Sequence, residues 1–358
     1  MPKVKIQGRL TKDNVTRPMG MNVLEAAKFR INKILDRYDH VGVSFSGGKD
    51  SLAVMHLLKQ VKEERGEEPI VDCVFRDEEL IPDSVINFVD HYRQLPWVRM
   101  KWFAVPLKSN KCIFGKTVDY LQWDPNREHV RPIPEWAITA APGQVFDQYS
   151  MDDEVAKYYP GKICMMTGIR TSEGFMRYRA IINKINETFV CATQSPRVDL
   201  GRPVYDWEEA DVFRFFYDYN IEYAEIYDQQ VFAKQALRVS TPLHSEGSKR
   251  LGKWREIDPV FYDRVLQLFP EMGVQDLYNS DIKSLNNGLE DPTNWDELGF
   301  WIREKYSDDQ LTTAMQRYRE VMSFIKNPRV RDSYPFTSVL KKFKSGTIKR
   351  VFLPESKR

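Results

Sequence analysis

The stretch Val41-Gly-Val-Ser-Phe-Ser-Gly-Gly-Lys-Asp-Ser51 decides the fold. Its apolar residues Val41, Val43 and Phe45 alternate with smaller ones, which predicts a buried strand. Gly47 and Gly48 then allow a turn where a Cβ would clash. The following apolar residues share one helical face, and we expect Asp50 or Ser51 to cap that helix. The stretch therefore predicts a strand, a tight turn and a helix.

The turn has the features of a phosphate site. Free backbone N–H groups at a helix start, the positive end of the helix dipole and the Lys49 ammonium would converge on one spot. It is not a Walker A loop, because that pattern needs a glycine five places before Gly48, where Val43 stands. A Gly-Ser turn without a ligand is the alternative. The candidate nucleotide-binding residues here are Ser44, Ser46, Gly47, Gly48, Lys49, Asp50 and Ser51.

A second apolar run, residues 70–75, predicts a neighbouring strand that ends in Arg76-Asp-Glu-Glu. In open α/β sheets, ligands bind outside the carboxyl ends of the strands. Arg76 and Asp77 are therefore candidates for nucleotide binding. Carboxylates at such an edge could hold Mg²⁺, with Asp50 and Asp77 as its ligands, or could bind ribose hydroxyls. A solvated acidic loop is the alternative reading.

A third apolar run, Lys162-Ile-Cys-Met-Met-Thr-Gly168, predicts another buried strand, with a helix following to about residue 185. Arg170, Glu173, Arg177 and Arg179 cluster where the strand would end. Arginine suits phosphate because its planar guanidinium forms two parallel hydrogen bonds. Gly168, Arg170, Glu173 and Arg177 are thus further candidates for nucleotide binding, with surface salt bridges as the alternative.

Three segments together resemble one known group. Ser46-Gly-Gly-Lys-Asp-Ser51 resembles the pyrophosphate loop (PP-loop) of ATP pyrophosphatases and of phosphoadenosine phosphosulfate (PAPS) reductases. Gly168-Ile-Arg with Ser172-Glu173 and a later arginine resembles a PAPS reductase motif, with the serine and glutamate inverted. Residues 202–213, with Asp206-Trp207, resemble a third family segment, in which Asp206 would cap a helix. The second strand end is more acidic than in PAPS reductases.

The resemblance implies a doubly wound parallel α/β sheet that binds an adenine nucleotide, ATP or PAPS, together with Mg²⁺. It further implies that Lys49, Asp50 and Arg170 are catalytic. It extends weakly to PAPS reductase-like proteins with a helical C-terminal extension, some of them prophage-associated regulators. PAPS reductases carry cysteines in their C-terminal region, whereas this sequence has none after Cys191.

Three hypotheses follow from the resemblance. The leading one is an enzyme that cleaves ATP between its α- and β-phosphates, or that transfers adenylate or sulfur. The second is a PAPS-binding sulfotransferase or reductase that lacks the C-terminal cysteine. The third is a nucleotide-sensing regulator that binds DNA or a protein partner through a basic tail.

The chain divides by composition. We expect an arm at residues 1–20, a nucleotide-binding domain at 21–235, a helical region at 236–325 and a basic tail at 326–358. Residues 109–161 are proline-rich and predict an insertion with short helices, whose Trp123, Arg127, Arg131 and Trp136 either stack on a base or form a small core. The tail has ten basic residues against Asp332 and Glu355.

The overall composition excludes several classes. The sequence has 358 residues, 42% of them hydrophobic, and a net charge of +2. No apolar run is long enough to span a bilayer, and no secretory signal is evident at the N-terminus. The four cysteines are widely spaced without a Cys-x-x-Cys pair, which argues against a disulfide framework, a zinc site or an iron–sulfur cluster. We therefore expect a cytoplasmic protein.

Overall fold

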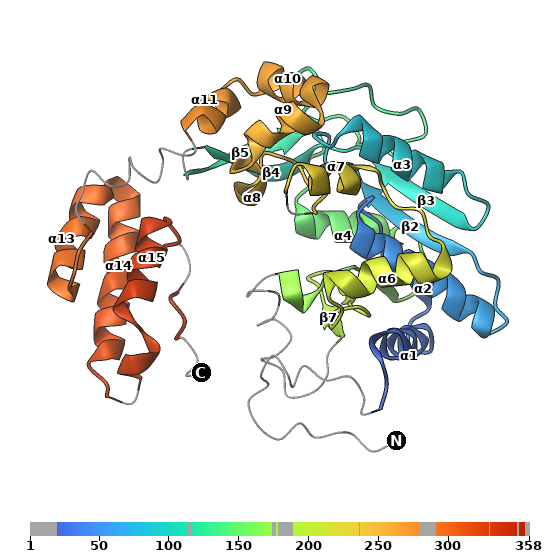
Figure 1. Ribbon diagram of the computed structural model, residues 1–358, viewed down its shortest axis with the longest axis horizontal. Coiled ribbons are helices and arrows are strands. Elements are labelled where there is room, and N and C mark those ends of the chain that lie inside the picture. The colour runs from blue at the N-terminus through green and yellow to red at the C-terminus, as the bar shows by residue number, and fades with distance from the viewer. Residues whose placement is uncertain are drawn as a thin grey trace. The chain divides into compact units, whose positions relative to one another are not determined.

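The computed structural model describes residues 20–113, 116–173, 177, 189–235, 237–278, 291–328, 330–348 and 351–354. Apart from Gly20, the expected N-terminal arm lies outside the described residues, as does most of the helix expected up to residue 185. The chain separates into two compact units, residues 1–110 with 119–269 and residues 111–118 with 270–358 (Figure 1).

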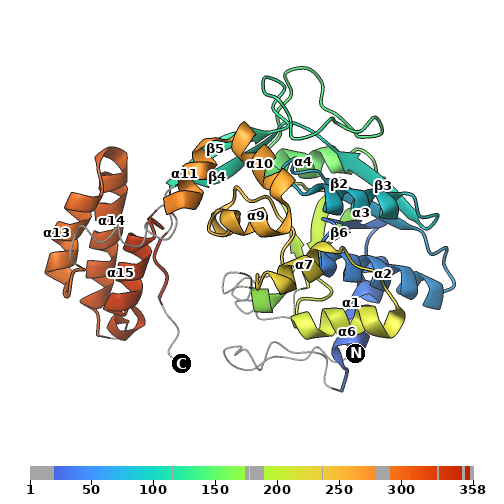
Figure 2. The same cartoon turned by 45° about the horizontal axis from the view of Figure 1, so that its top comes forward.

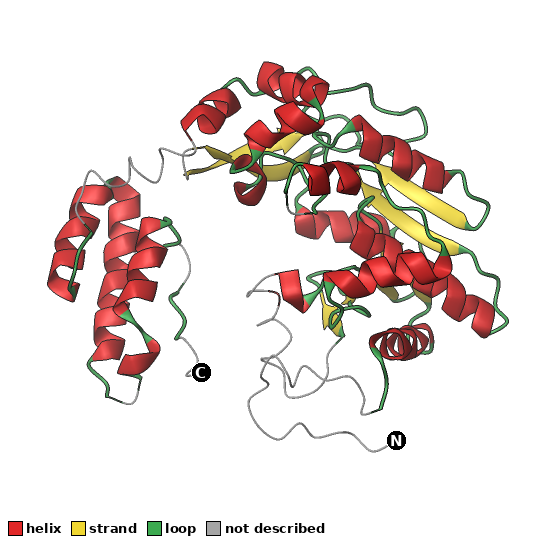
Figure 3. Ribbon diagram, in the orientation of Figure 1, coloured by secondary structure: helices red, strands yellow, loops and turns green. Residues whose placement is uncertain are grey.

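The first unit is built on a six-stranded sheet with the order β3-β2-β1-β6-β8-β7. Figure 3 draws the strands in yellow and the helices in red. All neighbouring pairs are parallel except β7 with β8, so the expected parallel α/β sheet is confirmed, with one antiparallel strand at its edge. The sequence analysis did not predict β8. The strands are β1 (His40–Ser44), β2 (Val71–Arg76), β3 (Val98–Phe103), β6 (Ile163–Met166), β7 (Val190–Ala192) and β8 (Val198–Gly201).

Helices cover the sheet. Figures 1 and 2 show α1 (Val23–Leu35), α2 (Lys49–Glu64) and α6 (Glu209–Tyr219) side by side, with α2 packed against both α1 and α6. The helix α4 (Gln148–Ala156) adds Met151 and Val155 to a core with Val74 of β2 and Met165 of β6. The helix α3 (Asp83–Arg93) packs on β3.

Two expected helix caps are wrong. The N-cap of α2 is Gly48, without a side-chain hydrogen bond, because the Ser51 hydroxyl instead donates to the Gly48 carbonyl oxygen at 3.0 Å. Asp206 does not cap α6, whose N-cap is Glu208. The Asp206 carboxylate instead accepts two hydrogen bonds from the buried Arg30, at 2.8 and 2.9 Å. Arg30 thereby links α1 to the segment before α6 through hydrogen bonds.

The expected insertion contains more strand than predicted. Residues 109–161 include α4 and most of a two-stranded sheet, which pairs β4 (Leu107–Ile113) with β5 (Lys116–Gln122). After α6 come α7 (Ile226–Phe232), α8 (Ser245–Ser248), the 3₁₀ turn η3 (Leu251–Lys253), α9 (Trp254–Ile257) and α10 (Pro259–Leu268).

Apart from the short pieces of β4 and β5 within residues 111–118, the regular structure described for the second unit is helical. The helices are α11 (Glu271–Tyr278), α13 (Trp295–Lys305), α14 (Asp308–Ile325) and α15 (Phe336–Lys344), with a 3₁₀ turn η5 (Arg331–Ser333) before α15. The last three share a core that includes Trp301, Val321, Val339 and Phe343. The segment expected to be a basic tail therefore folds as part of this core. None of the helices within the described residues is both long and apolar enough to cross a bilayer.

Candidate nucleotide-binding site

The turn between β1 and α2 is held by its own side chains. Gly47 has φ +74°, and a Cβ there would lie 2.8 Å from Val89 and 2.9 Å from Val85 of α3. The Ser51 hydroxyl oxygen accepts the Ser46 N–H at 3.2 Å and lies 3.1 Å from the Ser46 hydroxyl. Ser44 ends β1 and pairs in register with Val74 of β2. The turn therefore has the close backbone approach that the two glycines predict.

Lys49 lies inside the site rather than in solvent, since only 2% of it is exposed. Its ammonium donates to the Leu237 carbonyl oxygen at 3.1 Å and to Asp50 Oδ2 at 3.2 Å, and lies 3.4 Å from Glu209 Oε2. A buried ammonium is costly unless it is paired and hydrogen-bonded. These three oxygens pair the buried Lys49 ammonium within the protein.

The backbone N–H of Lys49 is also occupied. It donates to the Tyr227 hydroxyl at 2.8 Å, and Tyr227 is itself buried. The same hydroxyl would lie 3.2 Å from a Cβ on Gly48. Burial raises the pKa of Tyr227 strongly, so this side chain is neutral. A neutral oxygen thus sits where the start of α2 would receive an anion.

Arg170 reaches the same place from the end of β6. It is 3% exposed, and its Nε lies 2.7 Å from Asp50 Oδ1. The contact is possible because Gly168 has no side chain, since a Cβ there would lie 2.4 Å from the Asp50 carbonyl carbon and 2.5 Å from the Ser51 nitrogen. The structure therefore brings Arg170 next to Lys49 and Asp50, which lie on a different segment of the sequence.

Glu173 joins two arginines. It lies 3.6 Å from the terminal nitrogen of Arg170 and forms an ion pair with Arg177. The pKa of Arg177 is lowered, first by burial and then by the charges of Arg238, Arg170 and Arg202, with Asp50 acting in the opposite direction. The expected cluster thus also includes Arg202 and Arg238, so cations gather beside the start of α2. Arg179 lies outside the described residues.

The acidic residues that follow β2 form ion pairs within the protein. Asp77 is buried, and its carboxylate accepts hydrogen bonds from Arg131 at 2.5 Å and from the Trp102 indole at 3.1 Å. Arg127 pairs with Glu79, which is fully buried. The expected nucleotide contact Arg76 instead donates to Asp152 at 2.5 Å. Arg127 and Arg131 of the insertion therefore neutralise the carboxylates at the end of β2. These contacts give no support to the hypothesis that the two arginines stack on a base.

The expected magnesium ligands do not fit a metal site in this arrangement. The oxygens of Asp50 face Arg170 and Lys49, and those of Asp77 face Arg131 and Trp102. Within the part of the chain that the structure describes, no group of three or more His, Cys, Asp or Glu side chains could hold a metal ion.

Several site residues could not be found from local motifs. Lys49 is contacted by three residues that follow it by about 160–190 positions in the sequence, namely Glu209, Tyr227 and Leu237. Neither their residue types nor their spacing marks them in the sequence. The nearest signal is the Asp206-Trp207 segment, which leads directly into α6 and hence Glu209.

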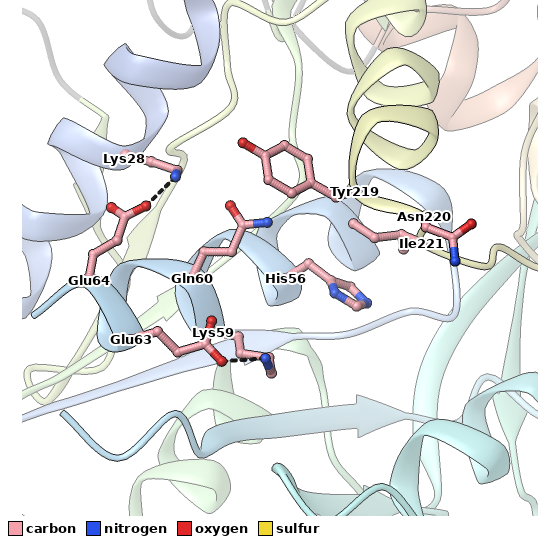
Figure 4. Close-up of a pocket in the computed structure, with 9 residues that line it drawn as sticks. All are labelled: Lys28, His56, Lys59, Gln60, Glu63, Glu64, Tyr219, Asn220 and Ile221. Carbon is pink, nitrogen blue, oxygen red and sulfur yellow. Dashed lines mark hydrogen bonds and ion pairs between the residues drawn. The ribbon is translucent and has the colours of Figure 1, made fainter. Parts of the chain in front are cut away.

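A separate hollow of about 430 Å³ lies along the outer part of α2 (Figure 4). Lys28 pairs with Glu64 there, and Lys59 with Glu63, so its charges are balanced. None of the PP-loop residues line it. The lining residues are Lys28, His56, Lys59, Gln60, Glu63, Glu64, Tyr219, Asn220 and Ile221.

Known protein families show which domain this chain contains. Residues 40–273 match the phosphoadenosine phosphosulfate reductase domain. The uncharacterized protein YbdN of Escherichia coli strain K12 is 29% identical over 265 residues, which cover 68% of this chain. The chain spans 64% of the length of that relative.

Solved structures show only loose similarity. PAPS reductase from Candida auris is 12% identical with a TM-score of 0.36, covering 60% of this chain and 90% of its own. FMN adenylyltransferase from Candida glabrata with ATP is 14% identical with a TM-score of 0.39, covering 57% of each chain. Yeast FAD synthetase with FAD is 13% identical with a TM-score of 0.38, covering 71% of this chain and 88% of its own. The family match spans more than half of the sequence, and the chain therefore belongs to the phosphoadenosine phosphosulfate reductase domain family.

Proposed function

We propose that this protein binds an adenine nucleotide at the PP-loop and cleaves ATP between its α- and β-phosphates, by hydrolysis or by transfer of adenylate to an acceptor. The supporting observation is the meeting of two buried cations, Lys49 and Arg170, at the start of α2. Buried cations at a helix N-terminus favour a bound anion. The family match supports the same ligand class.

The proposed roles follow from the contacts. The backbone at Gly47 and Gly48 approaches the leaving pyrophosphate. Lys49 exchanges the neutral Leu237 carbonyl for a phosphate oxygen. Arg170, held by Asp50, stabilises the negative charge that develops as the α–β bond breaks. Fixed charges that need no reorganisation are often the largest contribution to catalysis.

A PAPS-binding transferase or reductase is the second candidate. The family itself favours it, as do the arginines that surround Arg177, because a 3′-phosphate would add a second anionic group to the ligand. A nucleophilic thiol would have to come from elsewhere than the C-terminal region, since the sequence has no cysteine after Cys191.

Calorimetric titration of the full chain separates these candidates. ATP, AMP, PAPS and adenosine 3′,5′-bisphosphate would each be titrated with and without Mg²⁺, and pyrophosphate release from ATP would be measured in parallel. We expect ATP to bind and to yield pyrophosphate. Preference for the two 3′-phosphorylated ligands, without pyrophosphate release, would favour the second candidate. Binding of none of the four would remove both.

A further inference from the structure

The peptide bond between Leu237 and Arg238 lies beside the PP-loop and is hydrogen-bonded on both sides. Its carbonyl oxygen accepts a hydrogen bond from the Lys49 ammonium at 3.1 Å, and its N–H donates to Gln230 Oε1 at 3.0 Å. The C=O and N–H of a trans peptide point in opposite directions. This peptide, called the 237–238 peptide below, therefore lies between the Gln230 side chain and the lysine of the PP-loop.

Gln230 of α7 holds the 237–238 peptide in place. Only 2% of Gln230 is exposed, and its Nε2 donates to the Arg238 carbonyl oxygen at 2.7 Å. The carboxamide thus uses its acceptor and one donor on the two backbone groups of Arg238. Since the Arg238 N–H and the Leu237 carbonyl belong to one rigid peptide plane, these hydrogen bonds also direct the Leu237 oxygen towards Lys49.

The same helix occupies a second donor of Lys49. The Tyr227 hydroxyl, about one helical turn before Gln230, accepts the Lys49 backbone N–H at 2.8 Å. The N–H and the ammonium of Lys49 are the donors that this residue could offer to a phosphate. Both are bonded to uncharged oxygens, those of Tyr227 and Leu237. A phosphate oxygen forms a stronger hydrogen bond with an ammonium than an uncharged oxygen does, so it would compete successfully.

The Leu237 carbonyl is the partner of the Lys49 ammonium that a phosphate replaces most easily. The other two oxygens near the ammonium belong to the carboxylates of Asp50 and Glu209. Both attract the ammonium by their charge, and Asp50 is also held by Arg170 Nε at 2.7 Å. Because the Leu237 carbonyl has no charge, its exchange for a phosphate oxygen loses the weakest of the three interactions.

The chain turns through an unfavourable backbone conformation between α7 and the 237–238 peptide. Lys234 has φ +52°, in the left-handed region that residues with a side chain rarely adopt. Such residues persist where surrounding contacts hold them, and they are concentrated at functional sites and switch regions. The holding contacts here include the hydrogen bonds of the Gln230 side chain to Arg238 and that of the Gln235 N–H to the Gln230 carbonyl oxygen. Release of the 237–238 peptide from Gln230 would let this turn relax.

We infer that the 237–238 peptide is an autoinhibitory group that occupies the phosphate position at Lys49, and that Gln230 is the residue that positions it. This inference rests on the proposed function. A pyrophosphate group that takes the Lys49 ammonium must push the Leu237 oxygen away, and this movement breaks the hydrogen bonds of the same segment to Gln230. The free protein therefore opposes its own ligand, and any change that releases Arg238 from Gln230 strengthens binding.

Hydrogen exchange in the full chain tests whether the 237–238 peptide leaves. The Arg238 N–H is protected by Gln230 in the free protein, and we expect saturating inorganic pyrophosphate or ATP to speed its exchange several-fold. Mass spectrometry of a fragment that contains Arg238 would measure the rate. A ligand that docks without displacing the peptide would slow this exchange or leave it unchanged. The Glu67 N–H, bonded to the Lys62 carbonyl oxygen, is the internal control and should not change.

A variant tests the role of Gln230. Gln230→Met keeps a long side chain of similar size but loses both hydrogen bonds to Arg238. Calorimetry should show that it binds pyrophosphate and ATP about tenfold more tightly than the wild-type protein, since the bonds that oppose the ligand are already absent. Gln229→Met, at a partly exposed position of the same helix, is the matched control and should leave the affinity unchanged. A purely structural role of Gln230 would not tighten binding.

Two results would overturn the inference. One is binding of pyrophosphate with unchanged or slower exchange at Arg238, a measurement that needs only the wild-type protein and stands even if Gln230→Met does not fold. The other is an equal or weaker affinity in a folded Gln230→Met. Failure of the proposed function looks different: neither the wild-type protein nor Gln230→Met would bind pyrophosphate or ATP, and both proposals would then be withdrawn.

Discussion

The Tyr227 hydroxyl accepts the hydrogen bond of the Lys49 backbone N–H at a distance of 2.8 Å. This N–H belongs to the first turn of α2, where the four leading donors of a helix lack partners within it. An arriving phosphate must therefore share this donor with Tyr227 or displace the hydroxyl. The relationship makes α7 part of the nucleotide site, although no motif marks it.

Replacing Tyr227 by phenylalanine removes the competing oxygen. We expect pyrophosphate and ATP to bind several-fold more tightly, because a net hydrogen bond of about 1 kcal/mol no longer has to be exchanged. Calorimetry on Tyr227→Phe would measure this change. Tyr223→Phe, nearby but hydrogen-bonded to Asp228, serves as the control. Weaker binding by Tyr227→Phe would mean that the hydroxyl contacts the ligand.

Gly47→Ala should damage the PP-loop more than its backbone angle alone explains. Gly47 and Gly66 both have positive φ, so alanine at either position meets about 1–2 kcal/mol of strain. Only at Gly47 would the new Cβ also clash with Val85 and Val89. Urea unfolding should therefore show a larger loss of stability for Gly47→Ala than for Gly66→Ala. Equal losses would contradict the tight packing of the loop against α3.

His56 should make stability depend on pH. Burial lowers its pKa to about 4, below the ordinary value of 6.5, so the unfolded chain binds a proton more readily between these values. The contribution of His56 is complete above pH 6.5 and is lost as the pH falls towards 4. Since the Tyr92 hydroxyl donates to the Glu222 carbonyl, His56 Nε2 carries the hydrogen that it shares with Tyr92.

Urea midpoints at pH 7 and pH 5 would test this effect. The wild-type protein should lose more stability between the two values than His56→Gln does. An identical loss in both proteins would assign the pH dependence to other groups.

Phe343→Ala should unfold or weaken the helical unit, because Phe343 is fully buried with Trp301 and Val321. We expect a loss of about 3–5 kcal/mol. Tryptophan fluorescence during urea unfolding would report it, with the half-exposed Leu353→Ala as the control. Truncation after Ile325 would remove the same contacts. The DNA-binding hypothesis is therefore better tested by reversing the charge of the exposed Lys341 than by truncation.

The sequence predicted those parts of the fold whose signals are local. An alternating apolar pattern marked β1, continuous apolar runs marked β2 and β6, and the two glycines marked the turn before α2. The short strand β8 and the β4–β5 sheet were missed, because their residues Val198–Gly201 and Leu107–Gln122 carry no continuous apolar pattern.

The residues of the candidate site also differ in whether the sequence could predict their positions. Lys49 and Arg170 could be predicted to meet, because both follow buried parallel strands. The roles of Asp77 and Glu79 could not, because their arginine partners lie about 50 residues away in a segment without regular structure. Tyr227 is 178 residues from Lys49, and only the folded chain shows that the two meet.

The most direct test of the account is the affinity for ATP of Lys49→Met, measured by calorimetry beside Lys59→Met. Both lysines lie on α2, but Lys49 faces the PP-loop, whereas Lys59 pairs with Glu63 on the outer part of the helix. We predict that Lys49→Met loses ATP binding and pyrophosphate release while Lys59→Met keeps both. Equal ATP affinity in the two variants would contradict a nucleotide site at the start of α2.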